Sequence, residues 1–395
     1  MTKGDEVRMS QTKKLYDLDA YQVEFNARVL SCEEEECNQR TVYQVILDQT
    51  LFFPEEGGQS PDQGTIQQIP VLDVQIRGDI ITHTLENPVT VGQEVTGIID
   101  WKHRFNNMQQ HTGEHIFSGL VHQKFGYDNV GFHLSNQIVT MDFNGVLSME
   151  EAAEIESAAN EVITRNLEVY VSFPSKEELS QLDYRSKIEI EGQVRIVTIP
   201  EVDVCACCAP HVRRTGEIGM LKIMSLQNYK GGVRISILCG FRALEEYRKR
   251  NAILSELTSN LSTSQDTLIE AVNKIKSQNQ TLKAEIIAAK QEYMDAKLEG
   301  ISKEQPNVYL FERDLDPQVM RNVVNRLVTE HSGICGIFAG NDEEGYRYII
   351  GSSQEDARIV ATMLREKFGA KGGGSSAMVQ GSVVATKEMI ESQLN

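Results

Sequence analysis

The sequence predicts an α+β protein of several domains, and three observations support that prediction. Residues from about 20 to 100 carry β-branched side chains in partial alternation between turn signals, as the strands of a small β-barrel do. Residues 242 to 300 lack proline and are rich in helix formers. From Pro306 onward, strand-like and helix-like segments alternate. We therefore expect an N-terminal β-barrel (1–100), an α+β domain (101–240), a helical, coiled-coil-like arm (241–303) and a C-terminal α/β domain (304–395).

The composition is that of an ordinary soluble protein. Of the 395 residues, 40% are hydrophobic and 24% are charged. The start of the chain does not resemble a signal peptide, and no run reaches the roughly 18 apolar residues that a membrane span needs. Three of the seven cysteines crowd into residues 205–208, which favours reduced thiols and metal binding over a disulfide framework. We expect a cytoplasmic protein with no membrane partner.

The formal net charge of −18 is unfavourable for non-specific binding to nucleic acid. An RNA substrate stays compatible with it, because a local basic strip can dominate at a short Debye length. The sequence offers three such strips: Arg213-Arg214, the set Lys222, Lys230 and Arg234, and Arg248-Lys249-Arg250. By charge alone, each strip is better explained as a solvated face.

A split set of metal ligands is the most informative pattern in the chain. His111 and His115 are four residues apart, which places both imidazoles on one face of a helix. Roughly a hundred residues later, Cys207 and His211 follow each other in one short loop. Three imidazoles and one thiolate suit tetrahedral zinc. We expect one zinc ion per chain to join the two segments into one site.

Spacing alone does not decide which cysteine binds the metal. Cys205 and Cys208 also belong to the loop, and Cys205-x2-Cys208 is itself a chelating pair. Each half of the ligand set has an ordinary explanation when it is taken alone: a chance histidine pair on a helix, and a cluster of buried thiols. The combination of the two halves favours zinc.

Local signals place the two ligand segments within the α+β domain. A helix that follows Trp101 is expected to carry the histidine pair. A second helix is expected at about 149–166, with Ser148 as its N-cap and Glu151 completing a capping box. Strands are expected at 169–171, 194–197 and 233–237, so the cysteine loop lies between strands.

The arm is expected to contain two helices, because apolar residues follow 3/4 spacing on both sides of a break near Asn260. Ser262 with Gln265 could cap the second helix. A coiled-coil dimer and an antiparallel pair within one chain explain the pattern equally well. In the last domain we expect strands at 308–311, near Gly336 and at 346–350, with helices at 317–331 and 355–368.

Four stretches together resemble the alanyl-tRNA synthetase family. Residues 110–115, preceded by Ile-Asp-Trp, resemble the HTxxH segment of its editing domain, and Cys207–Val212 stands where the family carries CGGTHV. Residues 47–59 resemble its LDxTxFY…SGGQ stretch, and residues 371–381 are similar to KGGG…AQGG in its C-terminal domain. The barrel begins too close to the N-terminus to leave room for an adenylate-forming core. The chain thus resembles a free-standing editing protein of the AlaX type in its long form.

This resemblance implies a zinc-containing editing domain that removes a wrong amino acid from tRNA(Ala). Serine is the leading substrate and glycine the next. The implied metal ligands are His111, His115, Cys207 and His211. Whether zinc activates water or only positions the substrate stays open. A homodimer through the arm or the C-terminal domain is compatible with the sequence.

The resemblance also assigns roles outside the metal ligands. Thr50 is expected to sense the serine hydroxyl, and Gln59 to hold the substrate or the attacking water. Gly57 and Gly58 would let the backbone approach the substrate. A backbone nest that contacts tRNA phosphate is expected at Lys371, Gly372, Gly373 and Gly374, together with Gln380. For each of these, an ordinary structural role is the alternative.

Several features depart from the family pattern or allow other interpretations. Cys208-Ala209-Pro210 replaces Gly-Gly-Thr, which affects the loop's flexibility and its role in substrate contact. Glu114 could act as a base, but a solvated or supporting role is favoured because it neighbours His115 on the helix. His83 and His133 are better explained as structural histidines. Two other functions compete: a zinc-stabilised tRNA-binding protein without activity, and an HxxEH metalloprotease.

Overall fold

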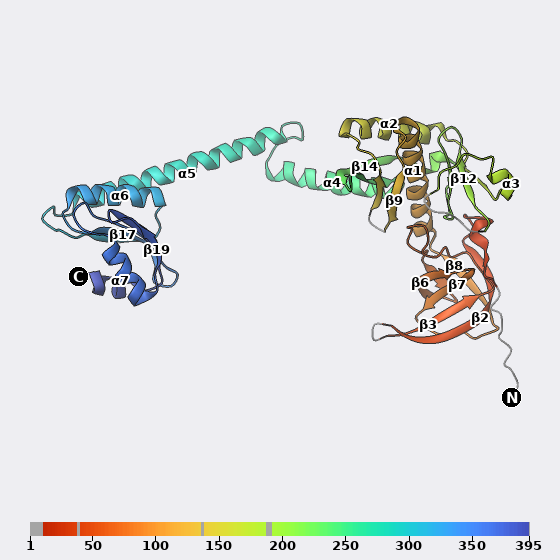
Figure 1. The fold of residues 1–395 in the computed structure, drawn as a ribbon, viewed down its shortest axis with the longest axis horizontal. Helices are drawn as coiled ribbons and strands as arrows, with labels where there is room; N and C mark the ends of the chain where they lie inside the picture. Colours follow the sequence, from red (N-terminus) through yellow and green to blue (C-terminus); the bar gives the residue numbers. More distant parts are fainter. Residues whose placement is uncertain (1–10, 38–39, 136–137, 187–191, 395) are drawn as a thin grey trace. The chain divides into compact units, whose positions relative to one another are not determined.

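The computed structural model describes residues 11–37, 40–135, 138–186 and 192–394. The chain forms two compact units, Met1–Ile253 and Leu254–Asn395. Figure 1 shows that both contain strands and helices, so the predicted mixed α+β class is confirmed. The finer division into four domains stays a prediction. No helix in the described part of the chain has the length and apolar character needed to cross a bilayer.

The first unit begins with a closed barrel, where strands were expected. Alternate side chains of its strands point inward, and Phe25, Val45 and Leu85 belong to its core. A short strand, β1 (Lys13–Lys14), pairs in parallel with β4 (Gln49–Thr50) and leads into the 3-10 helix η1 (Leu15–Asp17). In spatial order the barrel strands are β2 (Glu24–Cys37), β3 (Arg40–Leu47), β7 (Ile80–Leu85), β6 (Ile69–Arg77), β5 (Gly64–Ile66) and β8 (Glu94–Ile99).

A long helix, α1 (Trp101–Phe125), follows the barrel directly. The Asp100 side chain caps it by accepting from the His103 backbone N–H, and Gly126 ends it in the left-handed conformation. The helix is buried on nearly all sides rather than along one stripe. A fully buried ion pair ties it to the barrel: the Arg104 guanidinium binds Asp62 and donates to Leu51 O at 2.5 Å and to Ala20 O at 3.0 Å.

The rest of the first unit wraps α1 with two small sheets and a second helix. That helix, α2 (Met149–Arg165), starts at the Ser148–Glu151 capping box that was predicted. The four-stranded sheet has the order β14 (Leu221–Tyr229), β15 (Gly232–Cys239), β10 (Val139–Phe143) and β9 (Asn129–Leu134). The three-stranded sheet has the order β11 (Tyr170–Ser172), β12 (Ile196–Ile199) and β13 (Asp203–Ala206). Two short helices also belong to the first unit: α3 (Lys176–Leu179) and η2 (Thr215–Ile218).

Two helices, α4 (Gly240–Asn260) and α5 (Leu268–Glu299), occupy the expected arm. The predicted break near Asn260 is confirmed, but the predicted cap at Ser262 is wrong. Ser262 lies in the left-handed region with φ +48°, and Thr267 precedes the first residue of α5. The connection between the helices therefore continues five residues past the predicted cap at Ser262. Within it, the Thr263 and Thr267 hydroxyls form a hydrogen bond of 2.8 Å.

The second unit is a five-stranded mixed sheet with helices on both faces. Helix α6 (Pro317–Glu330) shares one core with the end of α5, and α7 (Arg358–Phe368) and α8 (Lys387–Leu394) pack in another. The sheet order is β16 (Tyr309–Glu312), β17 (Cys335–Asn341), β18 (Gly345–Gly351), β20 (Met378–Val383) and β19 (Lys371–Gly374).

The prediction that Lys371–Gly374 adopt the conformation of a backbone nest is wrong. These residues form edge strand β19, paired antiparallel with β20. A Cβ at Gly372 would lie 2.3 Å from Gln380 O, and one at Gly374 would lie 2.2 Å from Met378 O. The glycines therefore serve close strand pairing, because a side chain at either position would meet the neighbouring backbone.

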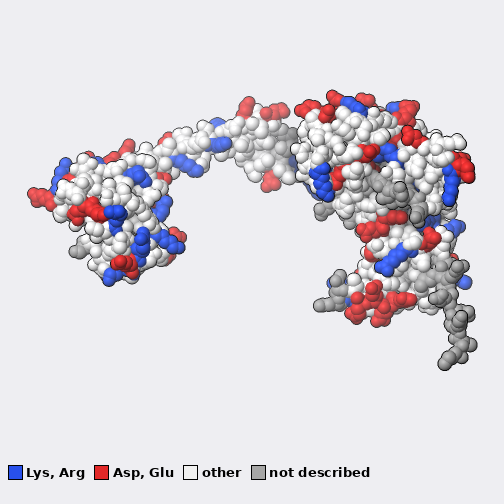
Figure 2. All heavy atoms as spheres, in the orientation of Figure 1, with Lys and Arg blue, Asp and Glu red and all other residues white. Residues whose placement is uncertain are grey.

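Two cations of the basic strips have acidic partners nearby, and the interpretation of the strips as solvated faces stays a prediction. Figure 2 shows acidic side chains gathered near the β2–β3 end of the barrel, and basic and acidic side chains interspersed elsewhere on the face shown. Arg213 pairs with Asp19 at 3.0 Å. Arg234 pairs with Asp142 at 2.6 Å. Each is thus neutralised by a local carboxylate.

Candidate metal centre

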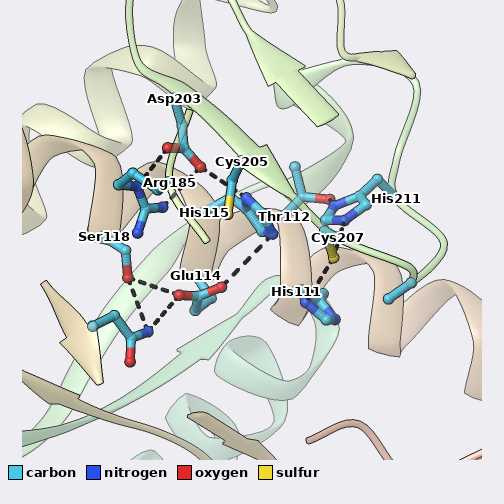
Figure 3. Close-up of polar contacts among 12 residues, drawn as sticks. His111, Thr112, Glu114, His115, Ser118, Arg185, Asp203, Cys205, Cys207 and His211 are labelled. Atoms are coloured by element: carbon cyan, nitrogen blue, oxygen red, sulfur yellow. Dashed lines mark hydrogen bonds and ion pairs between the residues drawn. The ribbon is translucent and has the colours of Figure 1, made fainter. Parts of the chain in front are cut away.

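Two buried segments bring four potential ligands together. Helix α1 supplies His111 and His115, which are 3% and 2% exposed because the helix runs through the interior. The loop that follows β13 supplies Cys207 and His211. One ligand atom from each residue lies within 4.8 Å of the others. Figure 3 shows the three rings and the thiol converging on one space.

Each imidazole is held through its Nδ1 atom by a different protein group. His111 Nδ1 lies 2.8 Å from Gln59 Oε1. His115 Nδ1 lies 2.8 Å from Asp203 Oδ2. His211 Nδ1 lies 3.0 Å from Thr112 Oγ1. Gln59 Oε1 and Asp203 Oδ2 are acceptors, and Thr112 Oγ1 can accept, so each Nδ1 has a partner to which it can donate. In the tautomer with Nδ1 protonated, the Nε2 lone pair of each ring is available for a metal.

The donor set fits a tetrahedral metal ion. His111 Nε2 lies 3.5 Å from Cys207 Sγ, and His211 Nε2 lies 3.3 Å from it. Three neutral nitrogens with one sulfur are a common ligand set for zinc. Burial opposes ionisation of the Cys207 thiol, but the imidazoles of His111 and His211 outweigh it and hold the pKa of that thiol well below its ordinary value. A metal could be held here by these four side chains.

The neighbouring cysteines lie in different surroundings from Cys207. Burial raises the pKa of the Cys205 thiol to about 11, and burial also raises that of Cys208. Cys208 Sγ lies against the Gly57 turn, away from the imidazoles, since a Cβ at Gly57 would be 3.3 Å from it. Cys205 lies close to His115 and Asp203, so these three could also hold a metal.

Asp203 and Arg185 support the His115 side of the centre. Arg185 binds the Asp203 carboxylate through Nε at 2.8 Å and Nη2 at 2.9 Å. Burial would raise the pKa of Asp203, but His115 and Arg185 outweigh it and lower this pKa. A charged carboxylate therefore orients His115 and increases the basicity of its Nε2.

Replacing Asp203 tests this support. Asp203→Asn removes the charge behind His115, and we expect the affinity for zinc to fall by about 10- to 100-fold. Competition with a chromogenic chelator measures the affinity. Asp183→Asn, which changes an exposed carboxylate two residues from Arg185, is the matched control and should leave affinity unchanged. Equal losses in both variants would contradict the assigned support.

Glu114 is buried, so of the two expected roles, solvated or supporting, the structure excludes the solvated one. It is 1% exposed because α1 is covered on that side by β9 and β10. Its Oε1 accepts from Ser118 Oγ at 2.7 Å and from Asn129 Nδ2 at 2.6 Å. Its Oε2 lies 3.9 Å from His115 Nε2. The carboxylate thus approaches the inner side of the centre, although adjacent helical residues diverge at their Cβ atoms.

Thr50 lies in the barrel core with His83 as its partner. Thr50 Oγ1 is 2.9 Å from His83 Nε2 and accepts from Phe52 N–H at 3.0 Å. His83 Nδ1 is 3.2 Å from Val45 O, and burial lowers the pKa of His83 to about 4. His83 is therefore the structural histidine that was expected. His133 is exposed on β9.

The Gly57–Gln59 turn joins the barrel to the metal centre. Gly58 has φ +80°, and a Cβ there would lie 2.4 Å from Phe132 O on β9. Leu134 N–H donates to Gly58 O at 2.7 Å, and Ser60 N–H donates to Leu134 O at 3.3 Å. The close approach of Gly58 is thus to another part of the protein. A close approach of substrate to this turn stays a prediction.

Sequence reasoning missed the groups that hold the ligands: Asp203, Arg185, Thr112, Ser118 and Asn129. A signal for one of them was present. Asp203 and Cys205 alternate along strand β13, which leads directly to Cys207, and alternate residues of a strand share a face. Arg185 and Asn129 reach the centre only through long-range contacts, which spacing does not encode.

Comparison with known proteins points to one family. Residues 3–103 match the family described as tRNA synthetases class II (A), and residues 194–236 match the threonyl and alanyl tRNA synthetase second additional domain. The second match contains the cysteine loop. The alanyl-tRNA editing protein AlaX-L of Pyrococcus horikoshii is 27% identical over 96% of both chains. The alanyl-tRNA editing protein Aarsd1 of Bos taurus is 33% identical over 67% of this chain.

The chain is similar in sequence to alanyl-tRNA editing proteins over most of its length. The resemblance drawn from the motifs is thereby confirmed. The alanine–tRNA ligase of Ignicoccus hospitalis is also similar, at 30% identity over 92% of this chain. The chain spans 40% of that ligase and 63% of the Bos taurus editing protein.

Proposed function

We propose that this protein hydrolyses the ester bond of tRNA(Ala) that carries serine, and of tRNA(Ala) that carries glycine, at a zinc site formed by His111, His115, Cys207 and His211. The convergence of these four ligand atoms within 4.8 Å carries the proposal. The names of the homologues support the substrate class. With all four side chains bound, a tetrahedral zinc would be closed and would only position the substrate. With a water or the substrate in place of one ligand, zinc would polarise the ester carbonyl or generate a nucleophilic water.

Gln59 is suited to bind the reacting ester. Its Oε1 accepts from His111, so the amide nitrogen points away from that ring. Gln59 is 1% exposed, and its Nε2 has no hydrogen-bond partner among the described residues. A buried N–H donor beside the metal centre can stabilise negative charge that develops on the carbonyl oxygen. This supports the role expected from the resemblance.

Thr50 is suited to select serine. Because His83 Nδ1 donates to Val45 O, His83 Nε2 accepts the Thr50 hydroxyl proton. Thr50 Oγ1 then accepts from Phe52 N–H and keeps one lone pair for the serine hydroxyl. Alanine offers no such donor, so it gains nothing from this contact.

Thr50→Val tests the selection of serine. We expect kcat/KM for seryl-tRNA(Ala) to fall about tenfold, the cost of about one hydrogen bond. Glycyl-tRNA(Ala), which has no side-chain hydroxyl, serves as the internal control and should lose less than about twofold. Steady-state deacylation with both substrates measures the ratio. Equal losses would show that Thr50 acts only through the barrel core.

The second unit and the arm are proposed to engage the rest of the tRNA and a second chain. Lys371 is exposed on edge strand β19. Gln380 accepts from Arg321 Nη2 at 2.8 Å, and Gly372 O accepts from Arg365 Nη2 at 3.1 Å. These cations lie beside Lys371–Gly374 and support a contact with the tRNA backbone. Exposed apolar residues on α5, including Ile269, Ile275 and Leu282, support a coiled-coil homodimer.

Deacylation of three substrates tests the proposed function. The zinc-loaded protein is incubated with seryl-, glycyl- and alanyl-tRNA(Ala), beside a His115→Ala variant. Serine and glycine should be released and alanine spared, and the variant should be inactive. Tight binding of tRNA without hydrolysis would instead support a zinc-stabilised tRNA-binding protein. Hydrolysis of casein would support the HxxEH metalloprotease.

A further inference from the structure

A second group of polar side chains lies on the barrel side of the cysteine loop. We call it the Tyr16 cluster, and it consists of Tyr16, Asp17, Glu56, Cys208 and Arg195. Arg195 Nη1 donates to Cys207 O at 2.8 Å and to Ala209 O at 2.9 Å, so it anchors the loop. The Cys208 thiol faces the Glu56 carboxylate. Tyr16 stacks edge-on against Phe53, with ring centroids 5.5 Å apart.

Four buried polar atoms of this cluster have no hydrogen-bond partner among the described residues: Tyr16 Oη, Asp17 Oδ1, Glu56 Oε2 and Arg195 Nε. Asp17 Oδ1 and Arg195 Nε lie 3.3 Å apart as an ion pair, which leaves two acceptors, Tyr16 Oη and Glu56 Oε2. Tyr16 is only 2% exposed, yet its Oη has none among the described residues. Glu56 Oε2 is also buried and, within the same part of the chain, also without one. Buried polar atoms are nearly always hydrogen-bonded in native proteins. Two such acceptors in one cluster are suited to bind a ligand that carries hydrogen-bond donors.

The charges in the cluster indicate that this ligand is a cation. Asp17 is already paired, since Arg195 Nε lies 3.3 Å from its Oδ1, and Lys14 adds a second positive charge nearby. Burial raises the pKa of the Tyr16 phenol, so this group stays neutral and can accept a hydrogen bond. Among the described residues, Glu56 is the carboxylate of the cluster that forms no ion pair. A group with N–H donors and one positive charge would satisfy Glu56 and Tyr16 together.

The position of Glu56 relates the cluster to the metal centre. Glu56 and Gln59 close one tight turn, with Glu56 N–H donating to Gln59 O at 3.3 Å and Gln59 N–H donating to Glu56 O at 3.1 Å. Gln59 reaches His111, whereas Glu56 reaches Cys208. The two side chains thus contact the surroundings of Cys207 from either side. In an aminoacyl ester, the α-ammonium is only two bonds from the carbonyl carbon.

We propose that Glu56 and Tyr16 form the subsite for the α-ammonium group of the aminoacyl ester. The proposal rests on the proposed function and adds the recognition of a free amine to it. Gln59 holds the carbonyl oxygen while Glu56 and Tyr16 hold the ammonium, so the ester is fixed at two points beside the metal centre. An acylated amine has neither the charge nor the three donors, and the site discriminates against it.

Binding of two non-hydrolysable probes tests the subsite. The first probe is 3′-deoxy-3′-(L-seryl)aminoadenosine, and the second is its 3-hydroxypropanoyl counterpart, which lacks the amine. Calorimetry with the zinc-loaded full chain should show the first binding about tenfold tighter or more. In Glu56→Gln the ratio of the affinities for the first and second probes should fall to about one, with the affinity for the second probe unchanged. Tyr16→Phe should lower the ratio by about threefold.

The matched control is Glu55→Gln, because Glu55 is the exposed neighbour whose carboxylate accepts from Gln75 Nε2 at 2.8 Å. This variant should keep the wild-type ratio, and all variants should retain zinc. A ratio of one in the wild type, or an unchanged ratio in Glu56→Gln, would overturn the subsite. If the wild type still released serine from tRNA(Ala), the proposed function would survive that result. Failure to bind either probe, together with failure to deacylate, would overturn both.

Discussion

Cys207→Ser should lower the affinity of the protein for zinc by about a hundredfold or more, and deacylation should be lost with it. Cys207 Sγ is the atom on which His111 and His211 converge, and the two imidazoles lower the pKa of its thiol, which favours the thiolate. A serine hydroxyl in its place stays protonated and is a poor ligand for zinc. Chelator competition measures the affinity, and cobalt substitution monitors the thiolate-to-metal charge-transfer band.

Cys208→Ser is the matched control for this prediction. It makes the same chemical change one residue away, on a side chain that faces Glu56 rather than the imidazoles. We expect it to retain both the affinity and the charge-transfer band. If Cys208→Ser or Cys205→Ser removed the band and Cys207→Ser did not, the ligand would be a different cysteine. The experiment therefore resolves the ambiguity of ligand choice within the CxCC cluster.

Arg104→Met should destabilise the first unit by about 3–5 kcal/mol. The substitution leaves the Asp62 carboxylate buried without its cation, and it removes the donors to Leu51 O and Ala20 O. Trp101 is the only tryptophan and lies one turn away in α1, so its fluorescence reports on this unit during urea unfolding. The midpoint should fall while the slope of the transition stays constant.

Two further variants identify the cause of that loss. Asp62→Asn combined with Arg104→Met removes the uncompensated charge and should recover part of the stability. Lys124→Met breaks the exposed pair with Glu154 and should cost less than about 1 kcal/mol. If Arg104→Met cost no more than Lys124→Met, the buried pair would not hold the barrel to α1.

The parts of the fold that sequence reasoning predicted are those whose signals are local. The Ser148 capping box needs only residues within one helical turn, and it starts α2 where expected. The spacing of His111 and His115 required only that α1 be a helix. Turn signals bounded the barrel strands in the same way, because each turn type demands particular residues. The pairing of the two ligand segments was inferred from chemistry, since no local signal carries it.

The failures arise where a local signal competes with tertiary contacts. Ser262 satisfied the pattern of a capping box, but the connection between the arm helices continues to Thr267. For Glu114 the sequence left a solvated and a supporting role open, and only the burial of this part of α1 against β9 and β10 excludes the solvated one. Lys371–Gly374 matched the composition of an anion-binding loop but forms an edge strand, because β20 supplies pairing partners. In each case, the deciding group is distant in sequence.

The separation of the ligands also sets an order of events during synthesis of the chain. His111 and Cys207 are 96 residues apart, so the ribosome releases the histidine pair well before the cysteine loop. At roughly 5–20 residues per second, this delay is on the order of 5–20 s. During that interval the barrel and α1 can form, but only two of the four potential ligands have been synthesised. Capture of a metal at this centre would therefore be a late step, and a nascent chain released early would carry only half of the candidate site.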